Sequence, residues 1–241
     1  MSASRRTLTL ALLSLACAPL FVQAATLGSG KSVTETRTVP EFQAIALAGA
    51  MDLLVRQGAQ QLQVQAEDNL LPLLETVVEN TSHGATLLVR WKKGINVYTR
   101  GKVQVTVSVP RLAALSAAGA GDMKIESFTT PALQVALSGS GDAWLEGLST
   151  DELGVRISGS GDVRGSGKAT KLKVGIAGSG DVRLADLRAD DVTVKIAGSG
   201  DAAVNASKTL EVSIAGSGDV TYTGNASLKS SVAGSGSVSK K

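Results

Sequence analysis

Cysteine and histidine are nearly absent from this sequence. Its 241 residues include one cysteine, Cys17, and one histidine, His83. Because Cys17 lies near the N-terminus, no disulfide can hold the rest of the chain together, and packing alone must stabilise the core. Most nucleophilic and acid–base sites of enzymes depend on these two residue types. Their scarcity argues against an enzyme, and His83, in the segment TSHG, is interpreted as a turn residue.

Aromatic residues, excess charge and long apolar runs are also scarce. Aromatics make up 3% of the sequence, too few for the stacking platforms of a sugar-processing cleft. The formal net charge of +3 falls to +1 once Arg5 and Arg6 are removed with the N-terminal segment, so the sequence predicts no nucleic-acid partner. After residue 24 no stretch approaches the ~20 apolar residues of a membrane-spanning helix, so it predicts no transmembrane segment.

The N-terminal segment, residues 1–24, has the features of a secretory signal. Arg5 and Arg6 precede an apolar run from residue 7 to 16, and Val22-Gln23-Ala24 offers a cleavage site. Two alternatives share the segment: a twin-arginine signal, and lipid attachment at Cys17. We expect cleavage after Ala24 and a bacterial protein that is periplasmic, associated with the cell envelope, or secreted.

Internal repetition determines the expected architecture. The tetrapeptide GSGD begins at residues 139, 159, 178, 198 and 216, GAGD begins at residue 119, and GSGS begins at residue 234. The last residues of successive motifs are 18 to 20 positions apart. A leucine or valine lies nine positions before the end of each later motif, so this half of the repeat has a constant length. The length varies only between the end of one motif and the next such leucine or valine. A period of this length is typical of a solenoid.

Apolar residues alternate before each motif, as in Leu172, Val174 and Ile176, which predicts a strand with one buried face. Gly178 and Gly180 continue the inward-facing positions, where the missing side chains indicate a sharp corner over the core. Like residues then form columns down the interior: Leu137, Ile157, Ile176, Ile196 and Ile214 in one, and Val135, Val155, Val174, Val194 and Val212 in another. The sequence therefore predicts an all-β fold, a parallel β-helix or solenoid with 18–20-residue coils. A β-sandwich is the alternative, but it fits such regular columns poorly.

Residues 25–110 contain a less regular version of the same pattern. Residues 45–55 keep the inward alternation, and Asp52 occupies the position of the motif aspartate. Residues 67–80, interrupted by Pro72, predict a brief helical turn, and residues 85–109 predict strands joined by tight turns. We expect 25–110 to form an irregular, β-rich lobe that caps the first edge of a β-helix formed by 111–241.

The order of these segments resembles a known domain family. The run RTVPEFQAIALAGAMDLLVRQ from Arg37, the later run VTVSVPRLAALSAAGAGDMKI and the GSGD repeats are similar to the family named "putative auto-transporter adhesin, head GIN domain". The resemblance extends from about Arg37 to the end of the chain. It implies an exported bacterial β-helix, right-handed, with no established biochemical activity, so adhesion is a family label only.

The repeated aspartate has a structural and a metal-binding interpretation. Stacked carboxylates ~5 Å apart repel one another, so we expect each one to accept bonds from backbone N–H groups beside its own glycine turn. Pairing with Lys124, Arg164 and Arg183 is also expected. The alternative is calcium binding by Asp142, Asp162, Asp181, Asp201 and Asp219. One carboxylate per repeat is fewer than a calcium loop supplies, so the sequence predicts no metal and no cofactor.

Two surfaces are candidate contact sites. In VRWKKGINVYTRGK, basic residues surround two aromatics at adjacent turns, a pattern that suits anionic lipid, lipopolysaccharide or an acidic polymer; a solvated hairpin rim is the alternative. These residues are Arg90, Trp91, Lys92, Lys93, Tyr98, Arg100 and Lys102. The second surface is an outward strip of small residues that another surface could approach closely, although small residues also suit a strand beside a corner. It includes Ser140, Ser160, Ser179, Ser199 and Ser217.

These features predict a non-enzymatic, exported interaction or scaffold module of the cell envelope. Its expected partner is an unidentified envelope protein or polymer, or a second copy of the chain in a homo-oligomer. The alternatives are a polysaccharide-binding or polysaccharide-degrading β-helix and a calcium-binding repeat protein.

Overall fold

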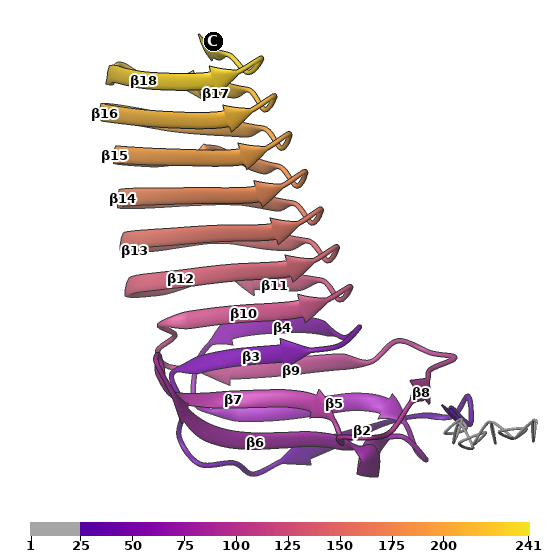
Figure 1. The fold of residues 1–241 in the computed structure, drawn as a ribbon. Helices are drawn as coiled ribbons and strands as arrows, with labels where there is room; N and C mark the ends of the chain where they lie inside the picture. Colours follow the sequence, from indigo (N-terminus) through magenta and orange to yellow (C-terminus); the bar gives the residue numbers. More distant parts are fainter. Residues whose placement is uncertain (1–24) are drawn as a thin grey trace, which may run out of the picture.

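The computed structural model describes residues 25–241, which are built almost wholly of β-strands. The predicted signal segment, residues 1–24, lies outside the described residues. Figure 1 shows a stack of coils that ends at the C-terminus and rests on a wider lobe. The predicted all-β solenoid, with coils about 20 residues long, is confirmed.

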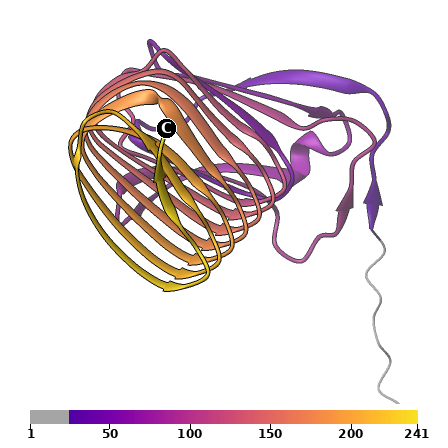
Figure 2. The same cartoon turned by 90° about the horizontal axis from the view of Figure 1, so that it is seen from above.

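The solenoid is a parallel sheet wound into coils. Its strands are β10 (Ala114–Gly119), β11 (Met123–Glu126), β12 (Thr129–Gly139), β13 (Ala143–Gly159), β14 (Val163–Gly178), β15 (Val182–Gly198), β16 (Ala202–Gly216), β17 (Val220–Thr223), β18 (Ser227–Gly234) and β19 (Val238–Lys240). Each of β13 to β16 runs from the second half of one coil into the first half of the next. Viewed along the stack, the coils lie over one another (Figure 2).

Like residues stack in register, as the repeat predicts. Val174 pairs with Val155 in the coil before it and with Val194 in the coil after it, and Ile176 lies between Ile157 and Ile196. These side chains are at most 3% exposed. The apolar columns therefore form one continuous core, and each internal coil depends on both of its neighbours for burial.

The two motif glycines are required by close contact between coils. Gly178 has φ +142°, in the region that favours glycine, and a Cβ there would overlap the carbonyl oxygen of Gly159. A Cβ at Gly180 would overlap the carbonyl oxygen of Gly161 and lie 3.0 Å from Cγ2 of Ile157. The corner predicted from the sequence is therefore so tight that no side chain fits between successive coils.

An additional coil lies beneath the regular repeats. β3 (Ala44–Ala48) pairs in parallel with β10, and β4 (Asp52–Gln57) pairs in parallel with β11. Asp52 thus begins the second strand of this coil, in the place that the motif aspartate has elsewhere. The lobe and the solenoid share one hydrophobic core, because the side chains of β3 and β4 belong to the same buried cluster as the repeats.

The rest of the lobe mixes parallel and antiparallel pairs. Its elements are β2 (Ser32–Arg37), β5 (Gln61–Glu67), the 3-10 helix η1 (Leu71–Leu73), β6 (Leu74–Thr81), β7 (Gly84–Trp91) and β9 (Gln104–Val109). β5 pairs antiparallel with both β2 and β9, and β6 with β7. The helical turn predicted for residues 67–80 is limited to η1. Residues 74–81 instead form a strand, because the hairpin with β7 satisfies their backbone groups.

Two short strands form an arm at the edge of the lobe. β1 (Thr26–Leu27) and β8 (Val97–Tyr98) make a separate two-stranded parallel sheet. Figure 2 shows this segment extending away from the coils. At the opposite end of the molecule, the last coil leaves Leu228 and Val232 39% and 42% exposed. Within residues 25–241, no helix has the length and apolarity to cross a membrane.

Candidate functional site

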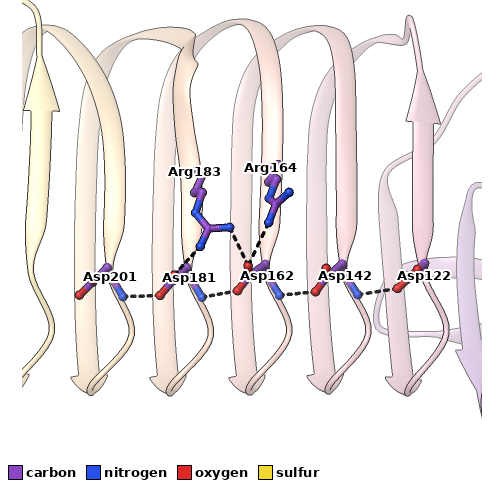
Figure 3. A network of polar contacts seen from close by, with 7 residues as sticks. All are labelled: Asp122, Asp142, Asp162, Arg164, Asp181, Arg183 and Asp201. Atoms are coloured by element: carbon purple, nitrogen blue, oxygen red, sulfur yellow. Dashed lines mark hydrogen bonds and ion pairs between the residues drawn. The ribbon is translucent and has the colours of Figure 1, made fainter.

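The motif aspartates form a continuous hydrogen-bonded ladder along the corner of the solenoid (Figure 3). In each step, the backbone N–H of one aspartate donates to Oδ1 of the aspartate in the coil before it. The bond from Asp162 to Asp142 is 2.9 Å, and that from Asp181 to Asp162 is 3.0 Å. The ladder begins at Asp52 and ends at Ser237, whose N–H and hydroxyl both bond to Asp219.

This arrangement differs from the expected one in the choice of donor. The prediction was that each carboxylate accepts a hydrogen bond from a backbone N–H beside its own glycine turn. In the structure, the donor is the backbone N–H of the aspartate in the next coil. A charge-assisted bond of this kind offsets part of the repulsion along the column. The aspartate therefore fixes the spacing and register of adjacent corners.

Two of the three expected cations pair with the column. Arg183 reaches Oδ2 of both Asp162 and Asp181 at 2.8 Å, and Arg164 lies 3.5 Å from Asp162 (Figure 3). The expectation for Lys124 was wrong, because its ammonium lies 3.0 Å from Glu146 and 3.3 Å from Glu126. Glu146 is the largest cause of the raised pKa of Lys124.

The ladder occupies one carboxylate oxygen of every aspartate in the column and both oxygens of Asp162 and Asp181. Every Oδ1 in the column accepts a backbone amide, and Oδ2 of Asp162 and Asp181 faces Arg183. Within residues 25–241, no group of three histidine, cysteine, aspartate or glutamate side chains is placed to hold a metal ion. The chemistry of the column fits a structural ladder better than a set of calcium ligands, which require several free oxygens around one ion.

The basic and aromatic residues of 90–102 divide into two groups. Arg90 pairs with Glu75 at 3.1 Å and with Glu79 at 3.5 Å, and Trp91 is partly buried against the core. These two side chains are held by the lobe and are not free to meet a partner. The other five predicted residues are exposed: Lys92, Lys93, Tyr98, Arg100 and Lys102.

The exposed residues belong to the arm and its connecting loops. Tyr98 is 65% exposed and lies in register with Leu27, which is 47% exposed. An aromatic and an aliphatic side chain thus lie side by side in solvent. Among residues 25–241, no carboxylate lies within ion-pair distance of Lys92, Lys93 or the Arg100 guanidinium. Lys102 lies 3.8 Å from Asp52, but its side chain is 90% exposed, so this pair contributes little.

A buried carboxylate anchors the arm. Glu67, 2% exposed, accepts the backbone N–H groups of Gly30 at 2.7 Å and of Arg100 at 3.0 Å. It thereby joins the segment after β1 to the segment after β8. The sequence analysis missed both Glu67 and Leu27, because neither belongs to a motif and their partners are more than thirty residues away.

The predicted strip of serines is exposed beside the glycine corner. The backbone N–H of Ser160 donates to Gly139 at 2.9 Å, and that of Ser179 donates to Gly159 at the same distance. Each serine therefore helps to join two coils through its backbone, while its side chain faces solvent. Use of this strip by a second copy or an envelope partner stays a prediction.

Comparisons with known proteins agree with this architecture. The family model "Putative auto-transporter adhesin, head GIN domain" matches residues 41–226. A crystal structure of a putative adhesin from Bacteroides fragilis is 26% identical, with a TM-score of 0.83 over 90% of this chain and 100% of that chain.

Two structures from Parabacteroides are also similar. A putative lipid binding protein from P. distasonis is 25% identical, with a TM-score of 0.74 over 90% of this chain and 100% of that chain. A putative adhesin from P. merdae, 24% identical over 90% of this chain and 99% of that chain, shares the fold with a TM-score of 0.70. No curated protein matches the chain. The family and these relatives are named as adhesins or a lipid-binding protein, and none is named as an enzyme.

Proposed function

Because this chain belongs to the family described as "putative auto-transporter adhesin, head GIN domain", we propose that it is an exported, non-enzymatic interaction module of the bacterial cell envelope. The solenoid is its rigid scaffold. The arm, defined here as residues 26–31 and 92–102, is its contact surface, and an anionic lipid surface is its partner.

The observation that carries this proposal is the pairing of exposed apolar and uncompensated basic side chains on the arm. Tyr98 and Leu27 lie in register and in solvent. Lys92, Lys93 and Arg100 supply positive charge around them without a carboxylate partner in the described chain. Tyrosine favours the boundary between lipid headgroups and acyl chains, and each nearby cation contributes about 1 kcal/mol at an anionic membrane.

The relatives support a binding role of this kind. One structure with the same fold over nearly the whole chain is named a putative lipid binding protein, and the others are named putative adhesins. The carboxylates of the repeats are engaged in the ladder, which leaves few groups for acid–base chemistry on the solenoid. Periplasmic, envelope-bound and secreted locations are all compatible with an arm that binds lipid.

Cosedimentation with lipid vesicles tests the proposal. The protein of residues 25–241, which begins after the predicted signal segment, should bind vesicles that contain phosphatidylglycerol and bind pure phosphatidylcholine weakly. A Lys92→Gln, Lys93→Gln, Arg100→Gln triple variant should lose roughly 100-fold in affinity, at about 1 kcal/mol per charge. Tyr98→Ser should weaken binding in both low and high salt, because its contribution is not electrostatic.

A matched control removes the same charge from the solenoid. Arg156, Lys171 and Lys195 are exposed, and none has an ion-pair partner within residues 25–241. The Arg156→Gln, Lys171→Gln, Lys195→Gln variant should bind anionic vesicles within about twofold of the unmodified protein. Equal losses in the two triple variants, or no binding by the unmodified protein, would refute the arm as a lipid contact.

A further inference from the structure

A groove runs along the corner of the solenoid where the repeat varies in length. It has a volume of about 660 Å³ and crosses four coils, from β12 to β15. This corner lies between the second strand of each coil and the first strand of the next, away from the glycine motifs. Its residues are not constrained by the close stacking that fixes the GSGD corner, so their side chains are available for another purpose.

Most residues that line the groove have polar side chains, and they are ordered in rows. Thr129, Ser149, Lys168 and Arg188 occupy one row, each in register with the next. The hydroxyls of Thr129 and Ser149 make no hydrogen bond to another described residue, unlike those of Thr130 and Thr150, which bond to backbone carbonyls. The groove thus offers two free hydroxyls followed by two cations along its length.

The two cations form an unfavourable pair within the chain itself. Lys168 and Arg188 are direct register partners on strands ~4.8 Å apart, and like charges in that position destabilise a sheet. No carboxylate of residues 25–241 lies within ion-pair distance of either side chain. Asp190, close to Arg188 in sequence, is already held by the Ser207 hydroxyl at 2.6 Å and by Lys208 at 3.0 Å.

Several charges on the solenoid are compensated between neighbouring coils, although some exposed cations, such as Arg156 and Lys195, have no ion-pair partner within residues 25–241. Lys173 bonds to Glu152 at 2.8 Å, and Arg183 bonds to two aspartates of the ladder. Lys168 and Arg188 differ from these cations because they are like-charged register partners with no ion pair within residues 25–241, and Arg188 acts on Asp190 only without direct contact. An anionic group bound between Lys168 and Arg188 would relieve the repulsion and gain two charge-assisted bonds.

We infer that this groove binds an acidic polysaccharide, with a sugar carboxylate between Lys168 and Arg188 and sugar hydroxyls on Thr129, Ser149 and Asp151. Asp151 is exposed and makes no bond to another described side chain, so its oxygens can accept from a hydroxyl. The groove contains no aromatic residue, which argues against a neutral sugar stacked on a ring. The strands around it are already paired on both sides, so it offers no free edge to an extended peptide.

The test uses the protein of residues 25–241 and a defined acidic oligosaccharide. Tetragalacturonate should bind, as measured by calorimetry, and maltotetraose, which is neutral and of equal length, should not. Lys168→Gln combined with Arg188→Gln should reduce affinity for tetragalacturonate by at least about tenfold, the value of one charged hydrogen bond. The same variant should melt at the same temperature or higher, because the repulsion between the two cations is removed.

A matched pair on another face controls for general charge effects. Arg156→Gln combined with Lys195→Gln removes the same charge outside the groove and should change affinity by less than about twofold. The inference is overturned if tetragalacturonate does not bind, if maltotetraose binds equally well, or if both double variants lose affinity equally. Because the arm residues are unchanged in all of these proteins, failure of this test leaves the lipid proposal standing, and failure of the vesicle test leaves this one standing.

Discussion

The solenoid and the lobe obtain their order from different kinds of contact. In the solenoid, a residue contacts its own equivalent in the next coil, as Val174 does with Val155 and Val194. In the lobe, the strands other than β3 and β4 mostly pair with strands that are not their equivalents. Leu62, for example, lies between Arg37 and Val107, in antiparallel register with both. Repetition therefore fixes many similar contacts at once, whereas the lobe depends on contacts that occur once each.

This difference extends to the polar residues. On the solenoid, the motif aspartates and most nearby cations are bonded from coil to coil. On the arm of the lobe, the buried carboxylate of Glu67 is a polar anchor, and several basic residues have no carboxylate partner within residues 25–241. The repeated aspartates of the solenoid bond to neighbouring coils. The residues proposed for recognition lie on the arm, outside the repeat, and in the groove, where the repeat varies in length.

The largest expected difference between the regions concerns glycine. Gly180→Ala should destabilise the protein by about 3 kcal/mol, because its Cβ would overlap the backbone carbonyl oxygen of Gly161 in the preceding coil. Gly94 in the lobe has φ +76° and nothing within 4 Å of an added Cβ, so Gly94→Ala should cost only about 1 kcal/mol of backbone strain. Chemical denaturation measures both, and equal losses would contradict the packed corner.

The next expected effect is local to the lobe. Glu67→Ala leaves the amides of Gly30 and Arg100 without their acceptor and should lower the free energy of local opening by about 2 kcal/mol. Hydrogen exchange should accelerate at residues 28–31 and 99–101, with little change over residues 130–220. Glu67→Gln, which keeps one acceptor oxygen, serves as the control. Accelerated exchange throughout the solenoid would show that the arm is not an independent unit.

A smaller effect is expected for the aspartate ladder. Asp162→Ala removes the acceptor of the Asp181 amide and should cost about 1 kcal/mol. Asp162→Asn keeps Oδ1 and should stay within about 0.5 kcal/mol of the unmodified protein, because lost ion pairs with arginine are offset by reduced repulsion along the column. Identical losses in the two variants, measured by urea denaturation, would mean that charge and not the backbone bond is what the column requires.

The pH dependence of the solenoid should be weak but of defined sign. The hydrogen bond from Lys173 holds the pKa of Glu152 below its usual range. A carboxyl group with a lowered folded-state pKa stabilises the protein above its unfolded pKa of about 4.3, and this contribution is lost as the pH falls through the folded value. Glu152→Gln should therefore lower the melting temperature slightly at neutral pH and leave it unchanged in acid. The opposite order would contradict the ion pair.

Chelation should have the smallest effect. If the aspartates serve as a ladder, addition of EDTA to the protein of residues 25–241 should leave its melting temperature unchanged. A fall of many degrees that calcium restores would instead support the calcium-binding alternative. The same measurement on Asp162→Asn would then show whether the column is the site.

The repeat made much of the solenoid predictable. Because each coil stacks on its equivalent, the apolar alternation around Val174 and the spacing of the motifs give the strand register directly. The donor to each aspartate was not predictable, since a local amide and one from the next coil fit the same sequence. The prediction for Lys124 was wrong because Glu126 on its own strand and Glu146 in the next coil, which are register partners, both lie within reach of its ammonium.

The lobe and the candidate sites were less predictable. Leu74, Val77 and Val78 alone do not decide between a helix and a strand, and the long-range pairing with β7 makes this segment a strand. The partial burial of Trp91 and the register of Leu27 with Tyr98 also depend on pairing between distant segments. The cations of the groove did leave a signal, because Lys168 and Arg188 are one coil length apart in the repeat.

The most direct test of the division between scaffold and contact surface is hydrogen–deuterium exchange with and without phosphatidylglycerol vesicles. The account predicts that vesicles protect the amides of residues 26–31 and 92–102 and leave exchange over the GSGD corners unchanged. Protection along the aspartate ladder or the serine strip, with none on the arm, would contradict it.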